Sequence, residues 1–350
     1  MIVKNEAHCI RKCLESVKPF IDHWIICDTG STDSTEKVVR DILGSIPGSF
    51  EKHEWIDFST NRNKALELSR EHGDYSLIID ADDSFVSDNP NIFKDLDKEI
   101  YSIEINQNGV IYKRNQLIKN SAEAEFKGAV HEYIDTKHDS TKLDGCTIMF
   151  GGTGSRTKDP EKYKKDCEIL EKALIKDPNN ARDTFYLAQS YKDSDQLDKA
   201  IEMYLKRVNM GGWQEEVYFS FLQLAILSEK IKIDPLAICN NYLRAYNYYP
   251  SRIESLAYLA RYCRINHFYD HAYSFAKMGV KVSKPKDGLF IDADVYLWRI
   301  QDELATAAFS INKHKESLNI SIMLANNPYV PKEEKQRILK NIEIIQKIKQ

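Results

Sequence analysis

Hydrophobic positions in the first part of the chain alternate between two spacings. Apolar residues recur at helical spacing over 6–17, and a short apolar run at 24–27 is typical of a buried strand. The same alternation continues in order, with helical spacing at 35–43, a strand pattern at 50–55, a helix at 60–72 and a strand at 75–80. Strands that alternate with helices indicate a mainly parallel sheet, and 75–80 is expected to be its central strand.

The spacing changes after residue 83. Residues 101–105 alternate apolar with polar positions, Gly109 permits a turn, and 110–118 read as a partner strand. A period of two is typical of a sheet with one solvated face, which predicts an antiparallel addition to the parallel strands.

From about residue 160 helical spacing takes over, and small residues recur at a fixed interval. Ala188, Ala225 and Ala260 are separated by 37 and then 35 residues, and a second series, Ala200, Ala237 and Ala272, keeps the same steps. Two alanine series in step predict an internal repeat of helix pairs, which resembles tetratricopeptide repeats. We therefore expect an α/β domain over 1–155 and an all-α repeat domain over 156–350.

Composition narrows the class of protein further. The net charge of −4 across 350 residues argues against a nucleic-acid partner, and no apolar run is long enough for a membrane span. The start of the chain lacks the pattern of a secretory signal. Seven scattered cysteines without a Cys-x-x-Cys pair favour reduced thiols and a cytoplasmic location.

Three carboxylates follow the apolar run that ends at residue 79, namely Asp80, Asp82 and Asp83. Ligands bind beyond the carboxyl ends of parallel strands, and clustered carboxylates repel one another unless a cation lies between them. Oxygen ligands suit Mg²⁺ or Mn²⁺, so the segment is a candidate site for a metal that holds a diphosphate. A solvated acidic loop or a helix N-cap is the alternative for this segment taken alone.

Two further segments carry candidate chemistry. Residues 28–35, rich in small hydroxyl side chains, open a helix, which suits an anionic or nucleotide ligand but also ordinary capping. His131 and Glu132 follow a small apolar stretch and are compatible with either a structural or a catalytic role.

Five segments in order carry a resemblance to a known family: 1–6, 28–33, 62–66, 79–83 and 128–132. Together they resemble the family-two nucleotide-sugar glycosyltransferases, which have a GT-A fold with a Rossmann-like mixed sheet. The resemblance covers 1–155. It implies a donor site made by the residues that match these motifs, which are Val3, Asn5, Glu6, Asp28, Arg62, Asp80, Ala81 and Asp82.

Within that set the resemblance implies separate roles. The first strand end would lie beside the nucleobase and ribose, as would Asp28. Arg62 would lie near base or phosphate, because a guanidinium suits bidentate phosphate contact. Asp80 would contact ribose and Asp82 the metal, either Mn²⁺ or Mg²⁺, while Asp83 would support them or face the acceptor.

The family is typically inverting, which implies a carboxylate that deprotonates the acceptor. Glu132 matches the acidic residue at this point of the family and is expected to be that base. His131 is expected to be a metal ligand or to orient the base, with a structural role left open. Phe150 stands where relatives often place a further histidine ligand, and the glycines of 151–154 predict a flap over phosphates.

The sequence thus predicts a metal-dependent glycosyltransferase that uses a nucleotide sugar, in particular a UDP-sugar. A protein or peptide acceptor fits the repeat domain, and a glycan or lipid-linked acceptor fits the catalytic domain equally well. The repeat domain also allows a homodimer. Two other classes stay open: a non-catalytic nucleotide-sugar-binding scaffold, and a nucleotidyltransferase, against which the lack of a glycine-rich phosphate loop near residue 5 argues.

Overall fold

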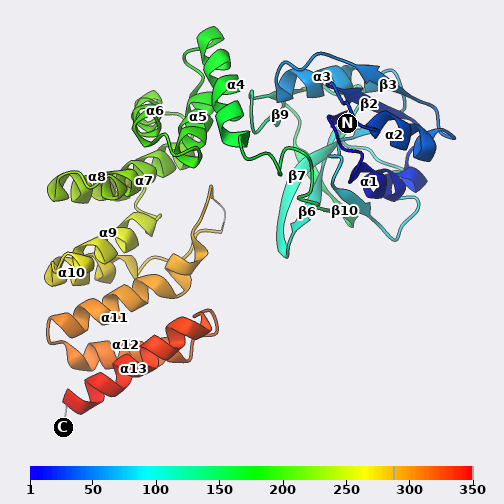
Figure 1. Cartoon of the computed structure of the whole chain (residues 1–350). Helices are drawn as coiled ribbons and strands as arrows, with labels where there is room; N and C mark the ends of the chain where they lie inside the picture. The colour runs from blue at the N-terminus through cyan, green and yellow to red at the C-terminus, as the bar shows by residue number, and fades with distance from the viewer. Residues whose placement is uncertain (287, 349–350) are drawn as a thin grey trace. The chain divides into compact units, whose positions relative to one another are not determined.

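The computed structural model describes residues 1–286 and 288–348, coloured by position in Figure 1. The chain forms two compact units, which divide between Ser194 and Asp195. The first contains all the β-strands of the described residues, and the second is made of helices. This is the fold class that the sequence predicted, an α/β domain with a mixed sheet followed by a helical repeat.

The first unit begins with a small parallel sheet in the order β1-β2-β3. The connections between these strands and onward are helical, as the alternating pattern predicted. The elements are β1 (Ile2–Val3), α1 (Ile10–Val17), the short 3₁₀ turn Lys18–Phe20, β2 (Trp24–Asp28), α2 (Thr35–Leu43), β3 (Gly48–Lys52) and α3 (Phe58–Ser69). Helix α1 starts four residues later than predicted because Asn5 adopts a φ of 58° and residues 6–9 form a turn first.

A second, five-stranded sheet has the order β4-β7-β6-β10-β5. Its strands are β4 (Tyr75–Leu77), β5 (Ser84–Val86), β6 (Ile100–Gln107), β7 (Val110–Lys119) and β10 (Ser140–Met149). The antiparallel pairing of β6 with β7 confirms the prediction from the period of two. The prediction of a central strand over 75–80 is wrong. Strand β4 lies at one end of this sheet, paired with β7, because the long strands β6 and β7 come between it and β10. The Ile78 amide still donates to the Gln116 carbonyl (2.7 Å), and the chain then turns over 80–83, where the Asp83 amide donates to the Asp80 carbonyl (3.1 Å).

A hairpin carries the His131–Glu132 segment. Strands β8 (Ala124–Lys127) and β9 (Tyr133–Thr136) pair antiparallel, and residues 128–132 form the loop between them. Gly128 and His131 both adopt left-handed backbone, with φ of 98° and 55°. Gly128 adopts this region at no steric cost, and Glu132, at the end of the loop, accepts a hydrogen bond from Arg62 Nε.

Two helices, α4 (Lys162–Lys176) and α5 (Ala181–Asp193), complete the first unit. Helix α5 is joined to the hairpin loop, because the Ala129 amide donates to Asp183 Oδ1 (3.4 Å). The last strand, β10, ends at Met149, and the first of these helices begins at Lys162. The predicted domain boundary, between residues 155 and 156, lies between these two points. The boundary of 1–155 and 156–350 stays a prediction about domains.

In the second unit each helix packs against the next helix along the chain, the arrangement of a repeat stack. Ala225, Ala260 and Ala272 are buried at these contacts, whereas Ala237 is only half-buried in the first turn of its helix. No helix in 1–286 or 288–348 is long and apolar enough to cross a bilayer. The elements are α6 (Leu197–Met210), α7 (Gln214–Lys230), α8 (Pro235–Tyr248), α9 (Glu254–Ile265), α10 (Tyr269–Gly279), the π-turn Val295–Arg299, α11 (Ile300–Ser310), α12 (His314–Ala325) and α13 (Lys332–Ile348).

Candidate functional site

The turn after β4 presents three carboxylates of different character. Asp83 is buried, and burial together with the charges of Asp80 and Asp82 raises the pKa of its carboxyl to about 7. The hydrogen bond from the Gly151 amide acts in the opposite direction and lowers this pKa. Partial burial would also raise the pKa of Asp80, but the charges of Arg62 and Arg114 outweigh it and lower that pKa. The turn therefore places three carboxylates within four residues, and they differ in how far positive charges nearby compensate them.

Arg62 of α3 joins two of the predicted site residues. Its Nη2 donates to Asp80 Oδ1 (2.7 Å) and its Nε donates to Glu132 Oε1, so residues far apart in sequence meet on one guanidinium. The Arg62 side chain is 9% exposed, and burial lowers its pKa less than the two carboxylates raise it. Arg62 was predicted near base or phosphate; in the structure its charge is already shared between two carboxylates, which makes it a residue that positions both.

The ends of β1 and β2 bring the other predicted donor-site residues together. The Asn5 amide donates to Ser31 Oγ (2.8 Å), and Asn5 Oδ1 accepts from the Thr32 amide (2.7 Å). Asp28 is buried, and its carboxylate accepts from the amide and hydroxyl of Ser31. The carbonyl of buried Val3 accepts from the Thr29 amide (2.9 Å). These hydrogen bonds hold the 28–35 turn against the end of β1. The Asp28 carboxylate takes part in them by accepting from Ser31 within the turn.

A glycine-rich segment, residues 151–155, which we call the flap, covers the carboxylates. Its backbone amides donate to side chains from two strand ends. Thr153 and Gly154 both donate to Asp82 Oδ2 (2.9 Å each), Gly151 donates to Asp83 Oδ1 (3.1 Å), and Ser155 donates to both Glu6 carboxylate oxygens (3.3 and 3.2 Å). The Ser155 hydroxyl also donates to the Asn5 carbonyl. The glycine-rich segment thus contacts Asp82 directly, and its role as a flap over phosphates stays a prediction.

Two glycines of the flap are required by geometry. A Cβ on Gly151 would lie 1.7 Å from the Asp82 carbonyl oxygen, a separation that no side chain tolerates. Gly152 has a φ of 63°, the left-handed region that favours glycine. Because the backbone approaches Asp82 this closely, the flap can reach its carboxylate with amides rather than with side chains.

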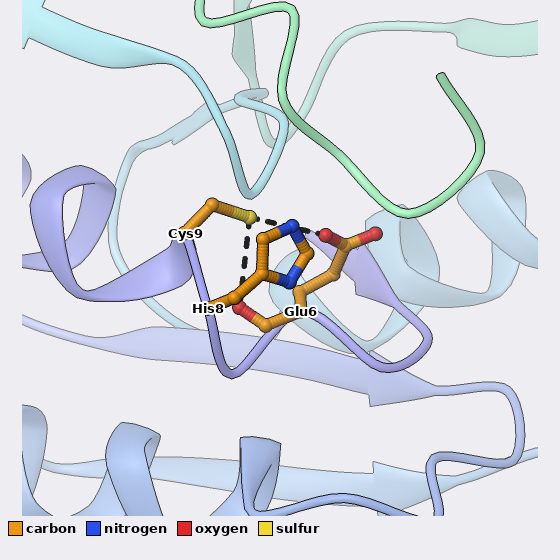
Figure 2. Close-up of side chains that lie close together, drawn as sticks. All are labelled: Glu6, His8 and Cys9. Atoms are coloured by element: carbon orange, nitrogen blue, oxygen red, sulfur yellow. Dashed lines mark hydrogen bonds between the residues drawn. The ribbon is translucent and has the colours of Figure 1, made fainter. Parts of the chain in front are cut away.

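Glu6, His8 and Cys9 gather on the turn between β1 and α1, as Figure 2 shows. Their ligand atoms lie within 4.8 Å of one another, and this is the one such group of three in the described residues. Each already has a protein partner: the Cys9 thiol donates to Glu6 Oε2 (3.1 Å), and His8 Nε2 bonds the Thr153 carbonyl (2.8 Å). Burial and the neighbouring Glu6 raise the pKa of the Cys9 thiol to about 12. The group fastens the β1 end to the flap.

His131 does not join the carboxylates. Its ring stacks on Tyr186 of α5 with centroids 4.4 Å apart, and its carbonyl accepts from Arg182 Nη2 (2.9 Å). Desolvation of the ring against Tyr186 lowers its pKa to about 4, although the residue keeps an exposed side. The role of His131 as a metal ligand stays a prediction, and the contact that the structure shows is the stacking of its ring on Tyr186.

Carboxylate oxygens such as those of Asp82 and Asp83 are the ligands that a hard divalent cation prefers. Burial raises the pKa of the Asp83 carboxyl, the charge of Asp80 adds to this and the charge of Asp82 adds less, so a cation at this turn would relieve the repulsion among the three carboxylates. Phe150, which stands where relatives often have a further histidine, is 37% exposed, and its side chain supplies no ligand atom. Any cation would therefore depend on these carboxylates, together with oxygens of a bound diphosphate or water.

A cavity of about 740 Å³ lies in the first unit. It is lined by residues near Trp24 and Tyr75, at the amino ends of β2 and β4, and also by Arg62, whose guanidinium joins Asp80 to Glu132. None of the three carboxylates lines it. The candidate site is therefore the carboxylate cluster, and Arg62 is shared between this cluster and the cavity.

Sequence reasoning missed several residues that shape the site. His8, Cys9, Thr153 and Ser155 contribute through backbone atoms or through contacts made only in the folded chain. The run of glycines at 151–154 was the one signal for the flap. No sequence pattern connected Arg62 with Glu132, because their meeting depends on how the β8–β9 hairpin packs on α3.

Comparisons with known proteins indicate the family that the first part of the chain resembles. Residues 1–121 match the family model described as glycosyl transferase family 2. Glycosyltransferase SunS of Bacillus phage SPbeta is 25% identical over 224 residues, which is 60% of this chain and 52% of SunS. A TPR repeat-containing protein of Synechococcus elongatus is 30% identical over 144 residues, 39% of this chain and 34% of that protein. The chain spans about half the length, or less, of the curated relatives it matches.

Solved structures that align with the chain are helical-repeat proteins. The crystal structure of MamA aligns with a TM-score of 0.38 and 17% identity, covering 53% of this chain and 92% of that chain. YrrB, described as a TPR protein with an unusual peptide-binding site, aligns with a TM-score of 0.37 and 12% identity over 48% of this chain and 79% of that chain. The repeat architecture itself is read from the packing of helices α6 to α13.

Proposed function

We propose that this chain, whose residues 1–121 carry a glycosyl transferase family 2 domain, is a metal-dependent glycosyltransferase that takes its sugar from a nucleotide sugar, in particular a UDP-sugar. The observation that carries the proposal is the meeting of Glu132 with Asp80 on the buried guanidinium of Arg62. It brings a candidate base beside the carboxylate turn, which is the pairing that sugar transfer needs.

In the proposed reaction Glu132 accepts the proton of the acceptor nucleophile. The nucleophile attacks the anomeric carbon from the face opposite the nucleoside diphosphate, which departs with the bonding electrons, so the configuration inverts. Asp82 and Asp83 would hold the divalent cation, which when bound supplies neutralisation of the charge on the leaving diphosphate. Arg62 keeps Glu132 and Asp80 in a fixed relation throughout.

Residues of the β1 and β2 ends would contact the nucleoside. Asn5 and Glu6 keep part of their surface exposed, whereas Asp28 is buried and bonded to Ser31, so Asp28 shapes this end of the site through its turn. His131 is proposed to support the hairpin loop through Tyr186 rather than to bind the cation.

For the acceptor we propose a protein or peptide, which helical-repeat domains commonly bind. A glycan is the competing acceptor, since the catalytic residues fit both. A homodimer through the repeat unit is a further proposal, which sedimentation of the whole chain would test.

The decisive experiment measures nucleoside diphosphate release from a panel of UDP- and GDP-sugars, with Mn²⁺ and with EDTA, while donor binding is recorded on the same samples. We expect slow acceptor-free hydrolysis of one donor, abolished by EDTA. Binding without turnover would leave the donor site standing and direct the search to the acceptor. The absence of any donor binding would overturn the proposal in favour of a scaffold that lacks catalysis.

A further inference from the structure

The flap has the chemistry of an anion-binding site, and its present anion belongs to the protein. Four of its five backbone amides, those of Gly151, Thr153, Gly154 and Ser155, point at carboxylate oxygens. Successive amides around a left-handed residue, here Gly152, form the concave arrangement that binds phosphate groups in many proteins. Two of these amides converge on a single oxygen, Asp82 Oδ2.

We propose that the Asp82 carboxylate is an internal occupant of a phosphate subsite in the flap, and that a divalent cation frees this subsite by drawing Asp82 away from it. This inference rests on the proposed function for the identity of the anion, a diphosphate. It assigns Asp82 two exclusive partners: the flap amides in the free protein, and the cation in the donor complex.

The exclusivity follows from charge and from the number of donors. An amide that donates to Asp82 Oδ2 cannot donate fully to a phosphate oxygen at the same place, and the carboxylate repels a phosphate from that place. A cation on Asp82 removes both obstacles, because it neutralises the carboxylate and competes for its oxygens. Diphosphate without a cation should therefore bind weakly, since the site is closed by the protein's own anion.

The structure also shows what holds the flap in place while this exchange occurs. Gly151 donates to Asp83, Ser155 donates to Glu6, and the Thr153 carbonyl bonds His8. The contacts of Gly151 and Ser155 lie on either side of the two amides that bind Asp82, and His8 holds the carbonyl that lies between these two amides. The central amides can thus change partner without opening of the whole segment.

The test compares Asp82→Ala with Asp82→Asn, using inorganic pyrophosphate in EDTA as the probe. Both variants remove the charge of Asp82, but the asparagine keeps a carbonyl oxygen that can accept from the flap amides, whereas the alanine vacates them. We expect pyrophosphate to bind Asp82→Ala about tenfold more tightly than Asp82→Asn, because charge-assisted hydrogen bonds to two freed amides are gained. Wild type should bind it least of the three.

Hydrogen exchange of the amides at 153 and 154 gives a second reading that involves no sugar transfer. We expect slow exchange in the wild type, faster exchange in Asp82→Ala, and slow exchange again when pyrophosphate is added to that variant. Equal pyrophosphate affinity in the two variants, or unchanged exchange at 153 and 154 in Asp82→Ala, would overturn the inference.

These outcomes separate the inference from the proposed function. If pyrophosphate binds Asp82→Ala as expected while no nucleotide sugar binds the wild type with Mn²⁺, the anion subsite stands and the glycosyltransferase proposal fails. If a nucleotide sugar is hydrolysed but the two variants bind pyrophosphate alike, the transferase stands and the internal-occupant role of Asp82 fails.

Discussion

Buried charge is handled differently in the two units. In the helical unit Arg252 is 0% exposed and pairs with Glu254 (2.8 Å), itself 1% exposed, and with Glu215. Arg207 pairs in the same way with Glu216 (3.0 Å). Every one of these carboxylates has a guanidinium as its partner, and the hydroxyls of Tyr218 and Tyr296 also donate to Glu254.

The α/β unit neutralises only part of its acidic cluster. Arg62 serves Asp80 and Glu132, whereas Glu6, Asp82 and Asp83 accept backbone amides and form no ion pair among the described residues. A network in which every buried carboxylate pairs with a guanidinium contributes to a unique packing. Carboxylates without a cationic partner lower the stability of the folded state, and a bound cation can restore it. The unneutralised carboxylates, rather than buried charge as such, distinguish the proposed site from the helical unit.

The largest effect is expected from Glu132→Gln. Glutamine keeps an oxygen for Arg62 but cannot accept the acceptor proton, so transfer should fall by about 10²- to 10⁴-fold while donor binding stays the same. Steady-state transfer and donor titration on one preparation measure both quantities. Glu125→Gln, on an exposed strand position, is the control; a near wild-type rate for Glu132→Gln would remove Glu132 as the base.

In the helical unit, Arg252→Met should cost about 3–5 kcal/mol of unfolding free energy, because it leaves the buried Glu254 and the half-buried Glu215 without their shared cation. Urea denaturation followed by circular dichroism measures it. Lys230→Ala removes an exposed pair with Asp195 and should cost at most about 1 kcal/mol. If the two substitutions lowered the free energy of unfolding equally, the buried ion pairs of Arg252 would contribute no more than the exposed pair of Lys230.

Ligands should stabilise the α/β unit through its open cluster. Mn²⁺ with UDP at 100 times its dissociation constant should add about 2.7 kcal/mol to the free energy of unfolding by mass action. Thermal denaturation with and without EDTA measures the shift, and Asp82→Asn should lose it. A shift that persists in Asp82→Asn would place the cation away from the carboxylate turn.

The smallest effect concerns Asp302, a carboxylate of the helical unit whose compensation is incomplete. Burial raises its pKa more than the Arg337 ion pair lowers it. Because the folded state binds this proton more tightly than the unfolded state does, stability is greatest below the ordinary aspartate pKa and declines as pH rises through the folded pKa. Asp302→Asn should flatten this part of the stability–pH curve, and Asp195→Asn, on an exposed side chain, should leave it unchanged.

The sequence predicted more of the packing in the helical unit than in the α/β unit. In the repeat, Ala225 and Ala260 lie at their predicted buried contacts because each helix meets mainly its neighbours, and neighbour packing is encoded in local spacing. In the α/β unit the alternation predicted helices and strands but placed 75–80 at the centre of the sheet. Strand order depends on pairing between distant segments, which a local apolar run does not encode.

The sequence by itself determined the fold class, the order of the motifs, the acidic cluster at 80–83 and the glycine-rich segment after Met149. Only the tertiary structure decided that Arg62 joins Asp80 to Glu132, that His131 turns to Tyr186, and that the flap amides bind Asp82. The reason is physical. Residue type and spacing specify which groups are available, whereas partner choice among charged groups is set by distances across the fold, and a carboxylate takes whichever donor the packing brings within reach.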